Sequence, residues 1–196
     1  SCEEFSVRAA GPFNRDHGFV FEVPATAEPT LTPARPLLAL GRMNHEAAVV
    51  DPASGVVYLT EDREESLCYR LLPEVPGELA RGGKLQALRL RHGPSDTRNW
   101  KGGPQLQPAK TFEVDWVTLD GVDSLEDDLR LRGHAEKSAA LFARGEGIWA
   151  SRAGIFFACT TGGPALRGQI FRYVPSEREG QSGESVRPGT IELFLE

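Results

Sequence analysis

The feature that most constrains the fold is the recurrence of short extended segments between loops rich in glycine and proline. The chain holds 21 glycines and 14 prolines, and they end each run of aromatic and β-branched residues before it becomes long. Many short strands at such spacing predict an all-β sandwich, barrel or propeller. The expected strands, about ten in number, cover residues 17–24, 46–51, 56–62, 66–73, 84–90, 112–119, 148–151, 155–160, 169–174 and 190–195.

Two pairs of these strands flank sequences typical of tight turns, Pro52-Ala53-Ser54-Gly55 and Arg152-Ala153-Gly154. Each pair therefore predicts an antiparallel hairpin. A hairpin followed by a strand that ends in proline recurs loosely, in residues 47–73 and again in residues 148–175. Such a repetition is typical of the blades of a propeller.

One helix is expected among the strands. Residues 136–143 (EKSAALFA) favour a short helix, with Arg144 at its end and Gly145 as the stop. The polar, Gly/Pro-rich residues 91–108 and 176–188 predict surface loops.

Length and charge limit the classes of function. A chain of 196 residues is long enough for one domain with a sizeable core. The net charge of -6 argues against a nucleic-acid partner, because a polyanion needs a positive footprint. No apolar run approaches the roughly 20 residues of a membrane helix, and no basic-then-apolar targeting segment is recognisable. Cys68 and Cys159 lie in apolar runs and are expected as small buried hydrophobes, whereas Cys2 precedes two carboxylates.

Four polar clusters stand at the ends of the expected strands. Hairpin geometry places Glu46, which opens a strand, at the same end as Glu61 and Asp62, which close its neighbour. Carboxylates that gather in this way repel one another unless a cation neutralises them. Calcium and ferric iron accept oxygen ligands, and a thiolate suits iron far better than calcium. The clusters are Cys2-Glu3-Glu4, Asn44-His45-Glu46, Thr60-Glu61-Asp62-Arg63 and Arg144-Gly145-Glu146-Gly147.

Each cluster also has a simpler interpretation. Acidic residues at strand ends are usually solvated turn residues. His45 is more often a structural hydrogen-bonding histidine than a ligand, and Arg144 suits a helix end, where the dipole favours a cation. The residue pattern alone leaves these alternatives open.

Several runs, taken in order, resemble the PhoX-type alkaline phosphatases and their broader β-propeller family. The resemblance lies in the order and number of the runs rather than in any single one. The runs are residues 1–4 (SCEE), 17–23 (HGFVFEV), 41–48 (GRMNHEAA), 58–63 (YLTEDR), 83–86 (GKLQ), 142–147 (FARGEG), 159–163 (CTTGG) and 168–173 (GQIFRY).

The resemblance implies a propeller with ferric iron and calcium in a central pocket, where phosphate monoesters are hydrolysed. It assigns Cys2 as an iron-bound thiolate, Glu46 and Glu146 as iron-binding catalytic carboxylates, and Arg144 as the catalytic guanidinium that clamps the phosphate. It further implies a periplasmic or secreted protein. The expected calcium ligands are Glu3, Glu4, Glu61 and Asp62.

Family members are much longer than this chain, so residues 1–196 are expected to form one partial propeller domain, about half of a six-bladed ring. The expected partners are a small phosphate ester and either a second copy or the remainder of a longer propeller. Two other functions stay open. One is a non-catalytic module that binds calcium or a partner, and the other is a calcium-dependent hydrolase of another class, such as a lactonase.

Overall fold

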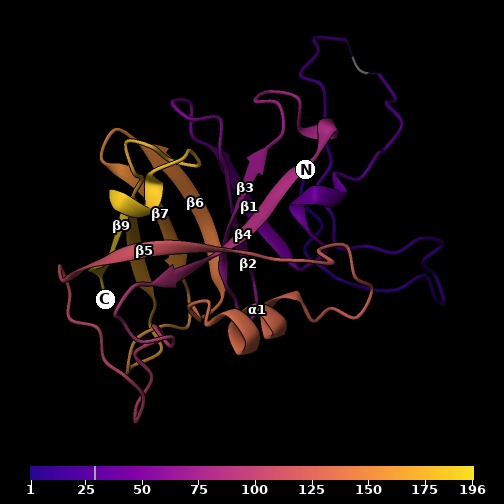
Figure 1. Cartoon of the computed structure of the whole chain (residues 1–196). Coiled ribbons are helices and arrows are strands. Elements are labelled where there is room, and N and C mark those ends of the chain that lie inside the picture. The colour runs from indigo at the N-terminus through magenta and orange to yellow at the C-terminus, as the bar shows by residue number, and fades with distance from the viewer. Residues whose placement is uncertain (29) are drawn as a thin grey trace.

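A computed structural model describes residues 1–28 and 30–196, and its strands form one antiparallel sheet (Figure 1). The sheet has nine strands in the order β1-β2-β3-β4-β5-β9-β8-β7-β6, which confirms the predicted all-β class. The strands are β1 (His45–Val50), β2 (Val57–Glu61), β3 (Cys68–Pro73), β4 (Gly83–Leu90), β5 (Thr111–Thr118), β6 (Gly145–Ser151), β7 (Gly154–Cys159), β8 (Gln169–Val174) and β9 (Thr190–Leu195). The helices are α1 (Leu129–Lys137) and three short 3-10 turns, η1 (Leu38–Leu40), η2 (Leu79–Arg81) and η3 (Glu184–Val186).

The sheet consists of two four-stranded meanders joined by β5. Strands β1–β4 form the first meander and β6–β9 the second, each strand pairing with the next along the chain. Strand β5 pairs with β4 through residues 114–118 and with β9 through residues 111–113, so it belongs to both halves. The end strands β1 and β6 lie against each other, and the sheet is therefore nearly closed. The two meanders match the repetition that the sequence predicted.

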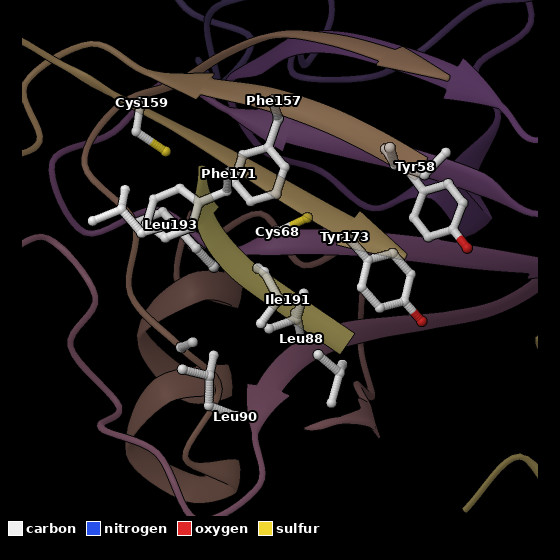
Figure 2. Packing of buried hydrophobic residues seen from close by; sticks show 14 of the residues in the cluster. Tyr58, Cys68, Leu88, Leu90, Phe157, Cys159, Phe171, Tyr173, Ile191 and Leu193 are labelled. Carbon is white, nitrogen blue, oxygen red and sulfur yellow. The ribbon is translucent and has the colours of Figure 1, made fainter. Parts of the chain in front are cut away.

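The main core lies between the two meanders (Figure 2). Phe157 and Phe171 stack with ring centroids 5.5 Å apart, and Phe142 meets both edge-on. Such offset and edge-on pairs stabilise a core beyond the area that they bury. Cys68 and Cys159 are fully buried in this core, as the sequence predicted.

The two meanders differ in how their other faces are covered. A second core fills the outward face of the first meander, where the N-terminal segment and α1 pack over Leu59 and Tyr69. Every residue of β2 is consequently buried. The outward face of the second meander instead exposes Trp149 and Phe194 to 71% and 50%.

The helix lies earlier in the chain than expected. It spans Leu129–Lys137 rather than residues 136–143, and Ser138 ends it with a left-handed φ of 56°. The residues that follow pair with other parts of the chain: Ala140 N–H donates to Leu88 O at 2.8 Å and Phe142 N–H to Ser66 O at 2.8 Å. Tertiary pairing has overridden helix propensity here. Within the described residues, no helix has both the length and the apolarity that a bilayer crossing requires.

Nine of the expected strands are present, but residues 17–24 form only isolated bridges, at Val20 and Phe21. The side chain of Glu3 explains the difference. Its Oε2 accepts the backbone N–H groups of Gly18 and Phe19 at 2.8 and 3.0 Å, so these donors are satisfied without a neighbouring strand.

A buried polar cluster joins the two meanders at the hairpin-turn end of β2. Glu179, in the connection between β8 and β9, accepts hydrogen bonds from Tyr58 of β2 and Tyr173 of β8, both at 2.8 Å. Arg70 of β3 pairs with both Glu179 and Glu184. These five residues are called the Glu179 cluster below. Every charge in it has a partner, as the low dielectric of a buried site requires.

Candidate functional site

Two β-bulges place glutamates at matching positions of β1 and β6. In the first meander the pairing of His45 with Glu61 is followed by that of Ala48 with Leu59, so one extra residue lies between them on β1. In the second meander the register shifts in the same way between Gly145 and Ile148 of β6. Bulges redirect side chains and are frequent beside active sites. Glu46 lies in the first bulge and Glu146 in the second.

The carboxyl groups of Glu46 and Glu146 lie close together. Burial, the charge of Glu146 and a hydrogen bond between the two groups raise the pKa of Glu46 to about 7. The charges of Glu4 and Asp62 raise the pKa of Glu46 as well. Near neutral pH Glu46 is therefore partly protonated or, in place of the proton, needs a positive charge nearby.

Arg144 sits beside this pair and is held by Asp62. Its Nε and Nη2 donate to the two oxygens of Asp62, each at 2.6 Å, and Nη2 approaches Glu146 Oε1 at 3.4 Å. The hydrogen bonds to Asp62 raise the pKa of the guanidinium, which stays charged. Arg144 has a left-handed φ of 54°, an unusual conformation for a bulky residue and one that is frequent at functional sites.

Glu46, Asp62, Arg144 and Glu146 are called the Glu46 cluster below. The Arg144 side chain is 37% exposed, so it can meet a ligand from solvent.

Cys2 and Glu4 border the Glu46 cluster. Cys2 is half-buried and forms an isolated bridge with Val20. Burial raises the pKa of the Cys2 thiol, the N-terminal charge lowers it, and the nearby Glu46 and Glu4 raise it further. Glu4 is exposed. Without a cation, Cys2 in this setting is a thiol rather than a thiolate.

Glu3 and Glu61 do not face the Glu46 cluster. Glu3 holds His17 Nδ1 at 2.7 Å, in addition to the two backbone donors described above. Glu61 is fully buried on the outward face of the first meander, where the Tyr69 hydroxyl donates to Oε2 at 2.6 Å. Burial raises the pKa of Glu61 to about 7. Glu61 and Asp62 diverge because successive residues of a strand point to opposite faces.

His45 has a structural role in the described contacts. Burial lowers its pKa to about 4, so the ring is neutral at physiological pH. Its Nε2–H then donates to Gly41 O at 3.0 Å. This agrees with the simpler of its two interpretations.

The sequence placed Arg63 and Thr60 in a polar cluster but predicted no role for either, and both support the Glu46 cluster. Arg63 donates to Asn44 Oδ1 at 3.1 Å and to Asp127 Oδ2 at 2.9 Å, while its carbonyl accepts the Arg144 N–H at 2.9 Å. Nothing in the sequence signals the contact with Asp127, which comes from the loop before α1. Thr60 lies beside both bulges. Side chains two residues apart on a strand point to the same face, so its position two residues before Asp62 could have predicted that Thr60 supports the cluster.

The donors of the Glu46 cluster suit a hard cation in kind. Two facing carboxylates are the kind of ligand that calcium and ferric iron accept, and a nearby thiol adds a donor for iron. In the part of the chain that the structure describes, no three His, Cys, Asp or Glu residues are grouped closely enough to hold a metal ion. The cluster therefore has fitting donors without a complete coordination shell.

Comparison with known proteins gives a family. The model of the family described as alkaline phosphatase PhoX matches residues 2–188. A solved structure of Pseudomonas fluorescens PhoX, in complex with vanadate, a transition state analogue, has a similar fold with a TM-score of 0.59 and 21% identity. The match covers 91% of this chain and 35% of that one, so the chain spans about a third of its length. No curated protein matches the sequence.

Proposed function

The chain belongs to the alkaline phosphatase PhoX family, and from this premise we propose that the Glu46 cluster helps to hydrolyse phosphate monoesters with bound cations. The observation that carries the proposal is the pair of matching bulges, which bring Glu46 and Glu146 together beside a half-exposed guanidinium. Two carboxylates that repel each other are unfavourable for the fold alone, and such an arrangement is typical of a site where a bound ligand offsets the repulsion.

Arg144 is the proposed phosphate-binding group. A guanidinium offers two parallel hydrogen-bond donors to a phosphoryl group. Arg144 already donates two such hydrogen bonds to the carboxylate of Asp62. Asp62 thus orients the guanidinium of Arg144 and keeps it positively charged, so that the guanidinium can bind an anion that arrives from solvent. The left-handed backbone of Arg144 and the bond from its N–H to Arg63 O hold the side chain at the mouth of β6.

Glu46 and Glu146 are the proposed cation ligands, with Cys2 as a third donor for ferric iron and Glu4 and Asp62 as weaker candidates for calcium. Bound there, the cations would act as Lewis acids that offset phosphoryl charge and lower the pKa of an oxygen nucleophile. The residues themselves supply the negative charge that retains the cations. Glu3 and Glu61 are occupied by other contacts and support the fold around the site.

Turnover of p-nitrophenyl phosphate, with ferric iron and calcium supplied, tests the proposal. Arg144→Lys keeps the charge but loses the two-point geometry, so we expect kcat/KM to fall by about 10- to 100-fold. Arg98→Lys is the matched control, because Arg98 makes a similar two-point pair with Asp96 elsewhere. Equal losses in both variants would contradict the assignment of Arg144, and a parent chain without turnover would favour the non-catalytic module described next.

A non-catalytic module that binds calcium or a partner is the second candidate. The incomplete coordination shell within the described residues favours it, because catalysis would need ligands from beyond this set. X-ray fluorescence of the native protein separates the two. Iron together with calcium supports the phosphatase, and calcium alone supports the module or a calcium-dependent hydrolase such as a lactonase.

We also propose that the second meander packs against another sheet, from a second copy or from the remainder of a longer propeller. Trp149 and Phe194 are exposed on its outward face, where Phe194 also meets Phe156 edge-on. Light scattering after size exclusion tests for self-association, and a monomer at all concentrations would contradict the second-copy form. Family membership further supports a periplasmic or secreted location, which fractionation of the source cells would test.

A further inference from the structure

We propose that Thr60 is a positioning residue that ties the two bulges together and so sets the spacing of Glu46 and Glu146. Thr60 is 1% exposed and lies on β2, which pairs with β1 and also contacts β6. The inference rests on the proposed function only where it concerns cation binding. Its geometric part is independent of any ligand.

The Thr60 hydroxyl bonds to both bulges at once. Its Oγ1 accepts the N–H of Ala47, in the first bulge, at 3.2 Å. The same hydroxyl donates to the backbone carbonyl of Glu146, in the second bulge, at 2.6 Å, and its approach to Ala47 O is longer at 3.5 Å. One side chain thus connects the backbone beside one glutamate to the backbone of the other.

The bulges explain why a hydroxyl is needed at this point. An extra residue in a strand disrupts the local ladder and leaves backbone groups without their usual partners. Buried backbone donors and acceptors must nevertheless be satisfied. Thr60 serves one donor and one acceptor, which a single hydroxyl can do.

The link is made from the first meander alone. Glu61 pairs with His45 and Cys159 pairs with Gly145, so the residue of β7 that corresponds to Thr60 is Ala158. Alanine has no hydroxyl. If Thr60 loses its hydroxyl, no corresponding side chain on β7 can replace the link.

A double-mutant cycle without metal tests the geometry. Glu46→Gln and Glu146→Gln are introduced singly and together into three backgrounds, the parent, Thr60→Val and Thr60→Ser. The shift in urea midpoint that each introduction causes is measured at pH 8. We expect the shifts to be non-additive in the parent and in Thr60→Ser, which keeps the hydroxyl, and additive in Thr60→Val. Additive shifts in the parent, or equal non-additivity in all three, would overturn the inference.

Thr97→Val controls for the loss of a buried hydrogen bond as such. Thr97 is fully buried and donates to Leu141 O at 2.6 Å, away from the bulges. The Thr97→Val variant should lower the urea midpoint about as much as Thr60→Val does. It should leave the coupling between Glu46 and Glu146 intact. Coupling lost equally in both variants would show a general loosening and would overturn the positioning role.

Calorimetric titration with Ca²⁺ alone tests the link to function. Residues that orient metal ligands typically change affinity by about 10- to 100-fold when removed. We expect a loss in this range for Thr60→Val and less than about twofold for Thr60→Ser and Thr97→Val. Equal affinity in Thr60→Val and the parent overturns the role in cation binding. A parent that binds no Ca²⁺ contradicts the proposed calcium site, while the double-mutant cycle still decides the geometric role.

Discussion

The Glu46 cluster and the Glu179 cluster stand at opposite ends of β2, and each connects the same two meanders. Glu179 is 5% exposed, is paired with Arg70 and accepts bonds from two tyrosine hydroxyls. Glu46 is half-buried, faces Glu146 and has a pKa of about 7. At one end each carboxylate is paired with a buried guanidinium of the chain itself, and at the other two carboxylates face each other and leave negative charge that a ligand could neutralise. The first arrangement serves stability and the second suits ligand binding.

Removing Glu179 should have the largest effect of any change in either cluster. Glu179→Ala leaves Arg70 with one carboxylate partner and two buried hydroxyls without an acceptor, and we expect a loss of about 3–5 kcal/mol in the free energy of unfolding. Urea denaturation measures it. Glu184→Ala is a milder control because Glu184 is 17% exposed and Arg70 keeps Glu179. A loss below about 1 kcal/mol for Glu179→Ala would erase the contrast between the clusters.

Calcium should stabilise the protein through the Glu46 cluster. At about 100 times its Kd, a ligand that binds only the folded state adds about 2.7 kcal/mol, which a thermal shift would detect. The double change Glu46→Gln and Glu146→Gln should abolish this gain. Glu177→Gln, which removes a carboxylate that is 84% exposed and outside the cluster, should keep it. A gain that survives the double change would place the cation elsewhere.

The pH dependence of stability should show the repulsion at Glu46. A carboxyl whose folded pKa is raised binds more protons when folded, so its contribution to stability falls as pH rises from about 4.5 to about 7. Glu46→Gln should therefore match the parent near pH 4 and exceed it by about 1 kcal/mol at pH 8, after allowance for solvent screening. Urea denaturation at both pH values measures this. A variant that is less stable than the parent at pH 8 would contradict a raised pKa.

The pair of Asp62 and Arg144 should contribute least to stability. It is partly exposed, and such pairs contribute about 0.5 kcal/mol despite good geometry. Asp62→Asn should therefore shift the urea midpoint little, by about as much as Asp96→Asn does at the pair with Arg98. A loss of several kcal/mol would show that Arg144 is held for the fold rather than for a ligand.

The fold was largely predictable because its signals are local. Alternating faces and tight turns predicted nine strands at close to their observed bounds, since both depend on residues a few positions apart. The helix was misplaced because Ala140 and Phe142 pair with distant backbone groups, which no local propensity encodes. Residues 17–24 failed to become a strand for a similar reason, the long-range contact of Glu3.

The candidate site was predictable only in part. Hairpin geometry brings Glu46 and Asp62 to one end, and the match between the meanders adds Glu146. Successive side chains of a strand point to opposite faces, and this alternation, extended to the end of the strand, predicts that Glu61 and Asp62 diverge. Glu179 has no such signal: it follows β8 by only a few residues, but its partner Arg70 lies on a different meander. A buried ion pair between distant segments is a property of the packed structure.

The double pairing of β5 has a consequence for how the chain is made. Synthesis proceeds from the N-terminus, so β1 to β8 leave the ribosome before residues 190–195 of β9. Until β9 arrives, residues 111–113 of β5 have no partner strand, and the outer edge of β8 is open as well. The first meander can fold early, whereas the second must wait for its last strand. During that interval the nascent chain presents these two unpaired strand edges, and unpaired edges are sites where chains associate and aggregate.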